Sequence, residues 1–242
     1  MTSSGLILLF MKLDFLKMIN NVFYTSMFKL DNIFLKLKLI FFKITIFFND
    51  SYFDTKYNID TLPWVIMYDT NFKRTHKSIN VEQEDLSILQ MRRLFETLKI
   101  PQKSTFVDLN CFVGKGLMAA AEYGFKIVKG VESSLLLYSY TSKNILRYKE
   151  KSQTETEFLL ANINYSDFQL KDDENVFLLH NSLEHKTLEN IASSLTRNNR
   201  MIWMICIEPG CRGLIEKTMT INKVEKFNIL GKNIGVYQVN LS

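Results

Sequence analysis

Residues 105–132, TFVDLNCFVGKGLMAAAEYGFKIVKGVE, constrain the fold more than any other stretch of the chain. A short β-prone run ends at Asp108 and leads into a loop of turn-forming residues. The next residues predict a helix over 117–123, which Gly124 closes in the C-cap position. A second strand then ends at Glu132. Strand, loop, helix and strand in this order form a βαβ unit, and ligands bind beyond the carboxyl ends of its parallel strands.

Two acidic residues, Asp108 and Glu132, stand at the ends of these two strands. An acid about 20 residues after a glycine-containing loop is typical of ribose binding in nucleotide folds. We therefore expect the functional site at this edge of the sheet, with the rest of the chain supporting it.

Strands and helices alternate along the remaining sequence. Further strands are predicted at 158–160, 176–179, 201–207, 224–229 and 234–239, and helices at 81–98, 134–148, 183–196 and, in short form, after Gly213. The gap between the last two strands is so short that it forces an antiparallel hairpin. The predicted fold class is α/β: a doubly wound, Rossmann-like, seven-stranded and mostly parallel sheet that ends in an antiparallel hairpin.

The first 50 residues differ in composition from the rest. They are rich in Phe, Leu, Ile and Lys, and apolar residues fall at helical spacing at Leu37, Ile40, Phe41, Ile44 and Phe48. Because no uncharged run is long enough to cross a bilayer, we expect no transmembrane helix. The sequence predicts a helical extension over 1–50 and an α/β domain over 51–242, with a polar-aromatic connector at 52–69.

Two interpretations of the extension stay open. Its helices cap the core or mediate a dimer, or they form a basic amphipathic segment that lies peripherally on a membrane surface, with lysines at anionic head groups. The second interpretation makes lipid a partner of an otherwise cytoplasmic protein.

Composition excludes other classes of protein. A hydrophobic content of 47% supplies a packed core, and a net charge of +5 lacks the dense basic stripe of a dedicated nucleic-acid binder. The three cysteines are odd in number and not spaced as a usual zinc site, which indicates reduced thiols in the cytoplasm and no metal centre.

The segment DLNCFVG at 108–114 resembles the first motif, D-L-G-C-G-x-G, of the class I S-adenosylmethionine-dependent methyltransferases. The helix AAEYGF and the strand VKGVESS then follow this motif at the spacing that the family shows. The stretches FDTKYNIDT, VFLLHNSLEH and IWMICIEP are similar to one branch of uncharacterised bacterial members. The resemblance covers most of the chain, and that family has a seven-stranded sheet with a terminal antiparallel hairpin.

The resemblance implies S-adenosylmethionine as cofactor and methyl transfer to an unknown acceptor. Glu132 matches the family acid that holds the ribose hydroxyls, Asn162 or Asn164 the position near the adenine amino group, and Asn181 the polar residue after the fourth strand. The cofactor-binding residues implied are Asp108, Asn110, Gly114, Glu132, Asn162 and Asn181.

Where the family has three glycines, this chain has Asn110, Phe112 and Gly114. This departure motivates an alternative, in which the chain is a catalytically inactive, methyltransferase-like binding or scaffold protein. A third hypothesis, a nicotinamide-dependent oxidoreductase, is disfavoured because G-x-G-x-x-G spacing is absent.

No catalytic residue is assigned from the sequence. His180, His185 and Glu208 are candidates for a general base, although each type is also common as an ordinary strand-end or helix residue. Cys111 lies in the loop, but no histidine is placed beside it by the sequence, which favours a packed side chain over a nucleophile.

Overall fold

The computed structural model describes residues 36–61, 86–164, 167–169, 171, 173–180, 186, 189–190, 201–207 and 212–240. The chain separates into two compact units, Met1–Thr45 and Ile46–Ser242. In the first unit, the described residues 36–45 are helical. The second unit contains the sheet and the candidate site. Among the described residues, no helix has the length and apolar character needed to cross a bilayer.

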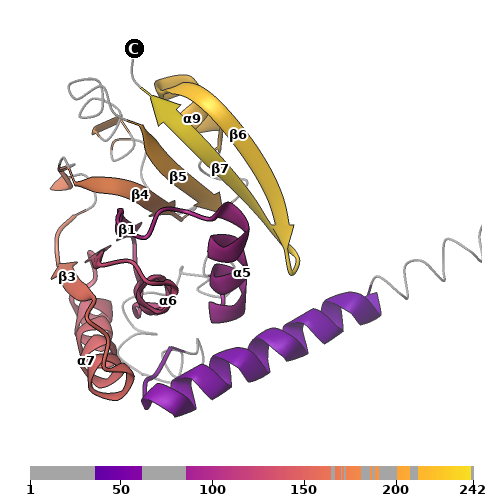
Figure 1. Ribbon diagram of the computed structural model, residues 1–242, viewed down its shortest axis with the longest axis vertical. Coiled ribbons are helices and arrows are strands. Elements are labelled where there is room, and N and C mark those ends of the chain that lie inside the picture. Colours follow the sequence, from indigo (N-terminus) through magenta and orange to yellow (C-terminus); the bar gives the residue numbers. More distant parts are fainter. Residues whose placement is uncertain are drawn as a thin grey trace, which may run out of the picture. The chain divides into compact units, whose positions relative to one another are not determined.

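The second unit is built on one seven-stranded sheet with the order β3-β2-β1-β4-β5-β7-β6 (Figure 1). Strands β1 to β5 pair in parallel, and β7 pairs antiparallel with both β5 and β6. The predicted α/β fold class and terminal hairpin are therefore confirmed. The strands are β1 (Thr105–Leu109), β2 (Ile127–Val131), β3 (Glu157–Ala161), β4 (Glu174–Leu179), β5 (Ile202–Ile207), β6 (Thr220–Ile229) and β7 (Lys232–Asn240).

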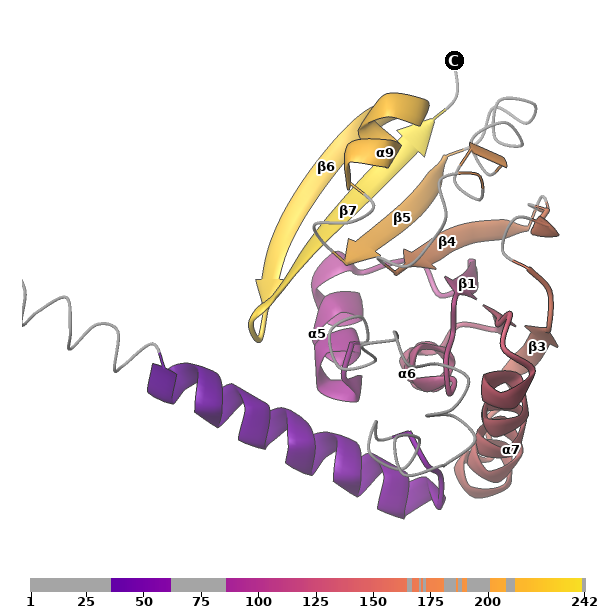
Figure 2. The same cartoon turned by 180° about the vertical axis from the view of Figure 1, so that it is seen from behind.

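Helices cover both faces of this sheet (Figure 2). Successive side chains of a strand point to opposite faces. Phe106 accordingly joins the core beneath three of the helices, while Val107 joins the core that contains Ile215 of the fourth. The first three are α5 (Ile88–Leu98), α6 (Lys115–Tyr123) and α7 (Leu135–Ser152), and the fourth is α9 (Arg212–Thr218).

Capping residues set the helix ends and correct two predicted boundaries. Helix α5 begins at Ile88, where Ser87 and Gln90 form a capping box, so residues 86 and 87 of the predicted helix are not helical. Residues 81–85 lie outside the described residues. Helix α7 starts after Ser134 as expected but runs to Ser152 rather than 148. Gly124 closes α6 with a φ of 111°, as predicted.

The terminal hairpin turns through two residues. Leu230 and Gly231 both have positive φ, at 49° and 84°, as a type I′ turn requires. This turn is tighter than the gap of 230–233 between the predicted strands, and β6 begins at Thr220 rather than 224.

The expected connector at 52–69 is wrong for its first residues. Residues 46–57 are helical in this unit, and the helix ends where Asn58 takes a φ of 55°. Phe53 and Tyr57 are buried one helical turn apart, and the Tyr57 ring lies 4.6 Å from that of Tyr148. Burial of these two rings outweighs the polar residues that suggested a connector. Residues 62–69 of the expected connector lie outside the described residues.

A buried ion pair joins this helix to the sheet-covering helices. Asp50 Oδ2 lies 3.2 Å from Lys115 Nζ, and both side chains are 5% exposed. Asp50 Oδ1 also accepts the amide of Ile88 at 3.0 Å. The first turns of α5 and α6 are thereby fixed to one carboxylate.

Candidate functional site

The loop between β1 and α6 holds three residues in the left-handed region. The φ angles are 77° at Asn110, 49° at Phe112 and 85° at Gly114. These are the three positions at which the resemblance expects glycine. Asparagine tolerates this region, but for phenylalanine it costs about 1–2 kcal/mol. The loop therefore keeps a glycine-type backbone although only one of the three residues is glycine.

Asp108, near the end of β1, is paired with a residue from the neighbouring strand. Its Oδ1 lies 2.9 Å from Nε2 of His180, which directly follows β4, and both side chains are almost fully buried. A side chain at Gly116 would place its Cβ only 2.3 Å from Asp108 Oδ2. The glycine thus lets α6 approach the carboxylate closely.

Glu132, after β2, fixes the loop and the start of α7. Its Oε2 accepts the amide of Phe112 at 3.0 Å, and its Oε1 accepts the amide of Ser134 at 2.8 Å. Glu132 is only 1% exposed. Asn162 donates from Nδ2 to the carbonyl of Glu132 at 2.7 Å, so two predicted site residues meet here.

Two side chains of α7 hold the loop carbonyls. The Thr141 hydroxyl donates to the carbonyl of Phe112, and Asn144 Nδ2 donates to the carbonyl of Val113 at 3.0 Å. Asn144 also bonds both backbone groups of Asp60. The sequence analysis did not identify these residues, although their spacing of three places both polar groups on one face of a helix.

The Phe112 side chain lies between elements of the site. It is 3% exposed and packs with Val113 and Leu137, while the edge of its ring faces His180 with 5.7 Å between centroids. The ring therefore lies between the residue that follows β4 and the start of α7, beside the strained loop.

Cys111 has the properties of a packed thiol. Burial, with the nearby carboxylates of Asp108 and Glu132, raises its pKa well above the usual value. A thiol that stays protonated is a poor nucleophile. The expectation of a packed side chain agrees with this environment.

Comparison of the sequence with protein-family models gives no match, and no curated protein matches it. Comparison with solved structures gives several methyltransferases. One is the tRNA (uracil-54, C5)-methyltransferase of Pyrococcus abyssi with S-adenosyl-L-homocysteine, with a TM-score of 0.45 and 16% identity over 62% of this chain. The chain spans only 38% of that enzyme's length.

Two other matches cover a larger share of the matched enzyme. The glycopeptide N-methyltransferase MtfA has a TM-score of 0.49 and 10% identity, over 64% of this chain and 91% of its own. Magnesium protoporphyrin IX methyltransferase from Synechocystis PCC 6803, with bound S-adenosylmethionine, has a TM-score of 0.47 and 12% identity. The match covers 74% of this chain and 95% of that enzyme. At these scores the matches carry no argument about activity, and the fold assignment rests on the sheet and its terminal hairpin. The chain has the class I methyltransferase fold.

Most side chains expected at the site of this methyltransferase-like domain lie together at one edge of the sheet. Asp108 and Glu132 stand at the strand ends, and Asn110 and Gly114 lie in the loop between them. Asn181, His185 and Glu208 lie outside the described residues. Within the described ranges, no group of three or more His, Cys, Asp or Glu side chains is arranged to hold a metal ion.

The loop backbone fits an adenosyl cofactor, and one side chain opposes it. Positive φ at three positions turns the chain sharply, as close approach of a ligand to the backbone requires. The Phe112 ring lies beside His180 and Leu137 at the same edge. The buried ring thus occupies space beside the loop.

Proposed function

We propose that this chain binds S-adenosylmethionine at the loop of residues 110–114 and transfers the cofactor's methyl group to an acceptor. The observation that carries the proposal is the left-handed backbone at Asn110, Phe112 and Gly114. Strain of this kind persists where the surrounding structure enforces it, and it is concentrated at functional sites.

The residues around the loop have distinct roles in this proposal. In the proposal, Glu132 accepts the ribose hydroxyls; its carboxylate is already oriented by the amides of Phe112 and Ser134. In the proposal, Asn162, whose Nδ2 donates to the carbonyl of Glu132, contacts the adenine. The bound cofactor supplies an electrophilic methyl group, and the protein supplies alignment and exclusion of water.

A buried carboxylate–histidine pair is the candidate for proton transfer from the acceptor. Asp108 bonds Nε2 of His180 and so fixes the orientation of the imidazole. An imidazole oriented by a carboxylate is suited to act as a general base. The pair lies beside the loop, since β1 and β4 are neighbours in the sheet.

Calorimetric titration with S-adenosylmethionine, S-adenosylhomocysteine and NAD tests this function. We expect the first two to bind and NAD not to bind. Glu132→Gln should weaken S-adenosylmethionine binding about ten- to hundredfold, because a hydrogen bond to a charged group contributes about 1.5–3 kcal/mol. Glu122→Gln, which changes a partly exposed carboxylate of α6, is the matched control and should bind as the wild type does.

The same titration distinguishes the alternatives. If none of the three molecules binds to the wild type or to Phe112→Gly, the methyltransferase proposal fails and a binding or scaffold role takes its place. Preferential binding of NAD would instead favour an oxidoreductase.

A further inference from the structure

The face of β2 and β3 opposite α6 and α7 holds a pocket separate from the loop. Lys129 pairs with Leu159 in register across the two strands, and Val131 pairs with Ala161. These four side chains therefore share one face of the sheet. Phe168, from the connection between β3 and β4, packs over this face with Val131.

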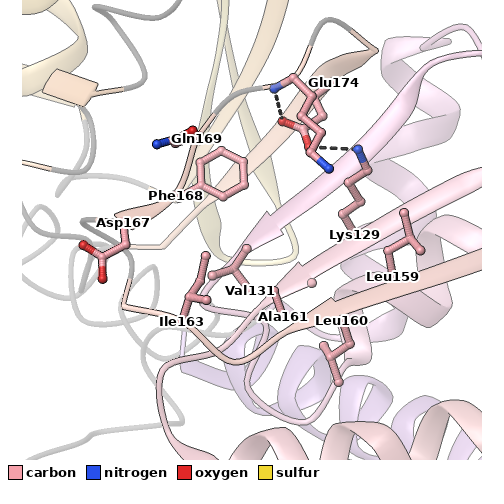
Figure 3. Close-up of a pocket in the computed structure, with 12 residues that line it drawn as sticks. Lys129, Val131, Leu159, Leu160, Ala161, Ile163, Asp167, Phe168, Gln169 and Glu174 are labelled. Carbon is pink, nitrogen blue, oxygen red and sulfur yellow. Dashed lines mark hydrogen bonds and ion pairs between the residues drawn. The ribbon is translucent and has the colours of Figure 1, made fainter.

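The pocket has a volume of about 430 Å³, which lies within the usual range for small-molecule sites. Its floor is formed by Val131, Leu159 and Ala161, with Ile163 and Phe168 beside them (Figure 3). Leu159 is 41% and Ile163 37% exposed. Apolar side chains are thus left partly in contact with water at a concave surface, which is typical of a ligand site.

Lys129 and Glu174 form a charged end of the pocket, and a further carboxylate, that of Asp167, also lines it (Figure 3). Lys129 Nζ lies 2.9 Å from Oε1 of Glu174, whose side chain is only 2% exposed. Oε2 of Glu174 accepts the amide of Lys171 at 2.8 Å, so both oxygens of this carboxylate are engaged. Glu174 therefore anchors the ammonium group within the apolar wall.

The second contact of the ammonium group is weaker. Asp173 lies 3.3 Å from Lys129 Nζ, and its side chain is 51% exposed. Burial lowers the pKa of Lys129, but the two carboxylates outweigh this effect and raise it, so the group stays charged. Exposed ion pairs contribute little stability, so a ligand anion can replace Asp173 at small cost.

We propose that this pocket binds a small carboxylic acid with an apolar body, whose carboxylate takes the place of Asp173 on Lys129. The apolar body lies along Val131, Leu159 and Ala161, and its far end reaches Ile163 and Phe168. The ligand carboxylate takes over the 3.3 Å contact that Asp173 makes with the ammonium group, and the Asp173 side chain, which is 51% exposed, turns to solvent. The proposal is independent of cofactor binding at the loop.

Titration of the full chain with decanoate, decanol and decylammonium, all below micelle-forming concentrations, tests the proposal. We expect one decanoate to bind per chain, and decanol about tenfold more weakly, because the charged hydrogen bond is lost. Decylammonium should bind more weakly than decanol. Chemical-shift changes should map to Lys129, Leu159 and Ala161.

Variants place the ligand and separate its two ends. Ala161→Phe fills the floor and should abolish decanoate binding, whereas Leu146→Phe, at an exposed position of α7, should not change it. The double variant Lys129→Met/Glu174→Gln removes both charges without leaving one buried and unpaired. It should lower decanoate affinity to that of decanol and leave decanol binding unchanged.

Several results would overturn the proposal. They are absence of decanoate binding, equal affinities for decanoate and decanol, tighter binding of decylammonium, and undiminished binding to an Ala161→Phe variant with wild-type circular dichroism.

Discussion

Phe112 combines a buried ring with a backbone conformation that disfavours any side chain. Its φ is 49°, and its amide and carbonyl are held by Glu132 and Thr141. Glycine at this position would remove both the strain and the ring. Because Glu132 and Thr141 hold its backbone, tertiary contacts impose the strained conformation of residue 112.

We predict that Phe112→Gly is more stable than Phe112→Ala by about 1 kcal/mol, because only glycine relieves the left-handed strain. Phe112→Gly should also bind S-adenosylmethionine more tightly than the wild type, because no ring has to be displaced. Urea unfolding and calorimetry measure the two effects.

The control pair for this prediction is Leu146→Gly and Leu146→Ala, in the interior of α7. There the order should reverse, with alanine more stable by about 1 kcal/mol. The same order at both positions would contradict the proposed strain at residue 112.

Asp54 makes the stability of the folded protein depend on pH. Burial raises its pKa to about 6, although the amide and hydroxyl of Thr61 both bond the carboxylate. The folded state therefore holds this proton at pH values where the unfolded chain, with a pKa of 3.8, releases it. The contribution to stability is complete below pH 3.8 and is lost as the pH rises through 6.

Asp54→Asn should remove this loss. At pH 8 we expect the variant to be more stable than the wild type by about 2–3 kcal/mol, and its free energy of unfolding should vary less between pH 4 and 8. Urea unfolding across that range measures it. Glu155→Gln, at an exposed position, is the control and should follow the wild-type curve. A variant curve parallel to that of the wild type would contradict the prediction.

At the scale of elements, the position of α6 depends on a missing side chain. The second residue of α6 is Gly116, where a Cβ would lie 2.3 Å from Asp108 Oδ2. Asp108 is itself held by His180, so the carboxylate cannot move aside freely. The second residue of α9 is also a glycine, Gly213, but a Cβ there would meet nothing within 4 Å.

We predict opposite effects for the same substitution in these two helices. Gly116→Ala should destabilise the protein by about 1–3 kcal/mol through overpacking. Gly213→Ala should stabilise it by about 0.5–1 kcal/mol, because alanine loses less conformational entropy in a helix. Thermal unfolding measures both, at roughly 2–4 °C per kcal/mol. Equal melting temperatures for the two variants would contradict the close approach of α6 to Asp108.

At the scale of the molecule, the structural boundary lies between Thr45 and Ile46. The helical residues after this boundary belong to the folded unit, since Phe53 and Tyr57 are in its core and Asp50 pairs with the buried Lys115. Residues 46–61 are therefore part of the α/β unit, because side chains of this segment belong to its core.

We predict that removal of residues 1–45 leaves a cooperatively folded unit whose melting temperature is close to that of the full chain. Removal of residues 1–61 should be far more damaging, because each buried aromatic ring contributes about 1.5–3 kcal/mol and Lys115 loses its partner. Circular dichroism melts compare the three proteins. A shorter variant as stable as the one that begins at residue 46 would contradict this assignment.

Local patterns in the sequence were sufficient for much of this fold. Continuous apolar runs marked β4 and β5, and Gly124 and Ser134 marked helix ends through capping, which acts over a few residues. The short gap after β6 required a hairpin for the same reason. The placement of Asp108 and Glu132 at one edge also followed, because consecutive parallel strands end on the same side.

Only the tertiary structure determined how the site is held together. The pairing of Asp108 with His180 requires β4 to lie beside β1, and this strand order is not encoded in either local sequence. The hydrogen bonds that Thr141 and Asn144 donate to the loop carbonyls likewise depend on packing between distant elements. The same holds for the burial of Phe53 in an expected connector. Local signals fix which element forms, whereas the partners of a buried polar group are fixed by which elements meet.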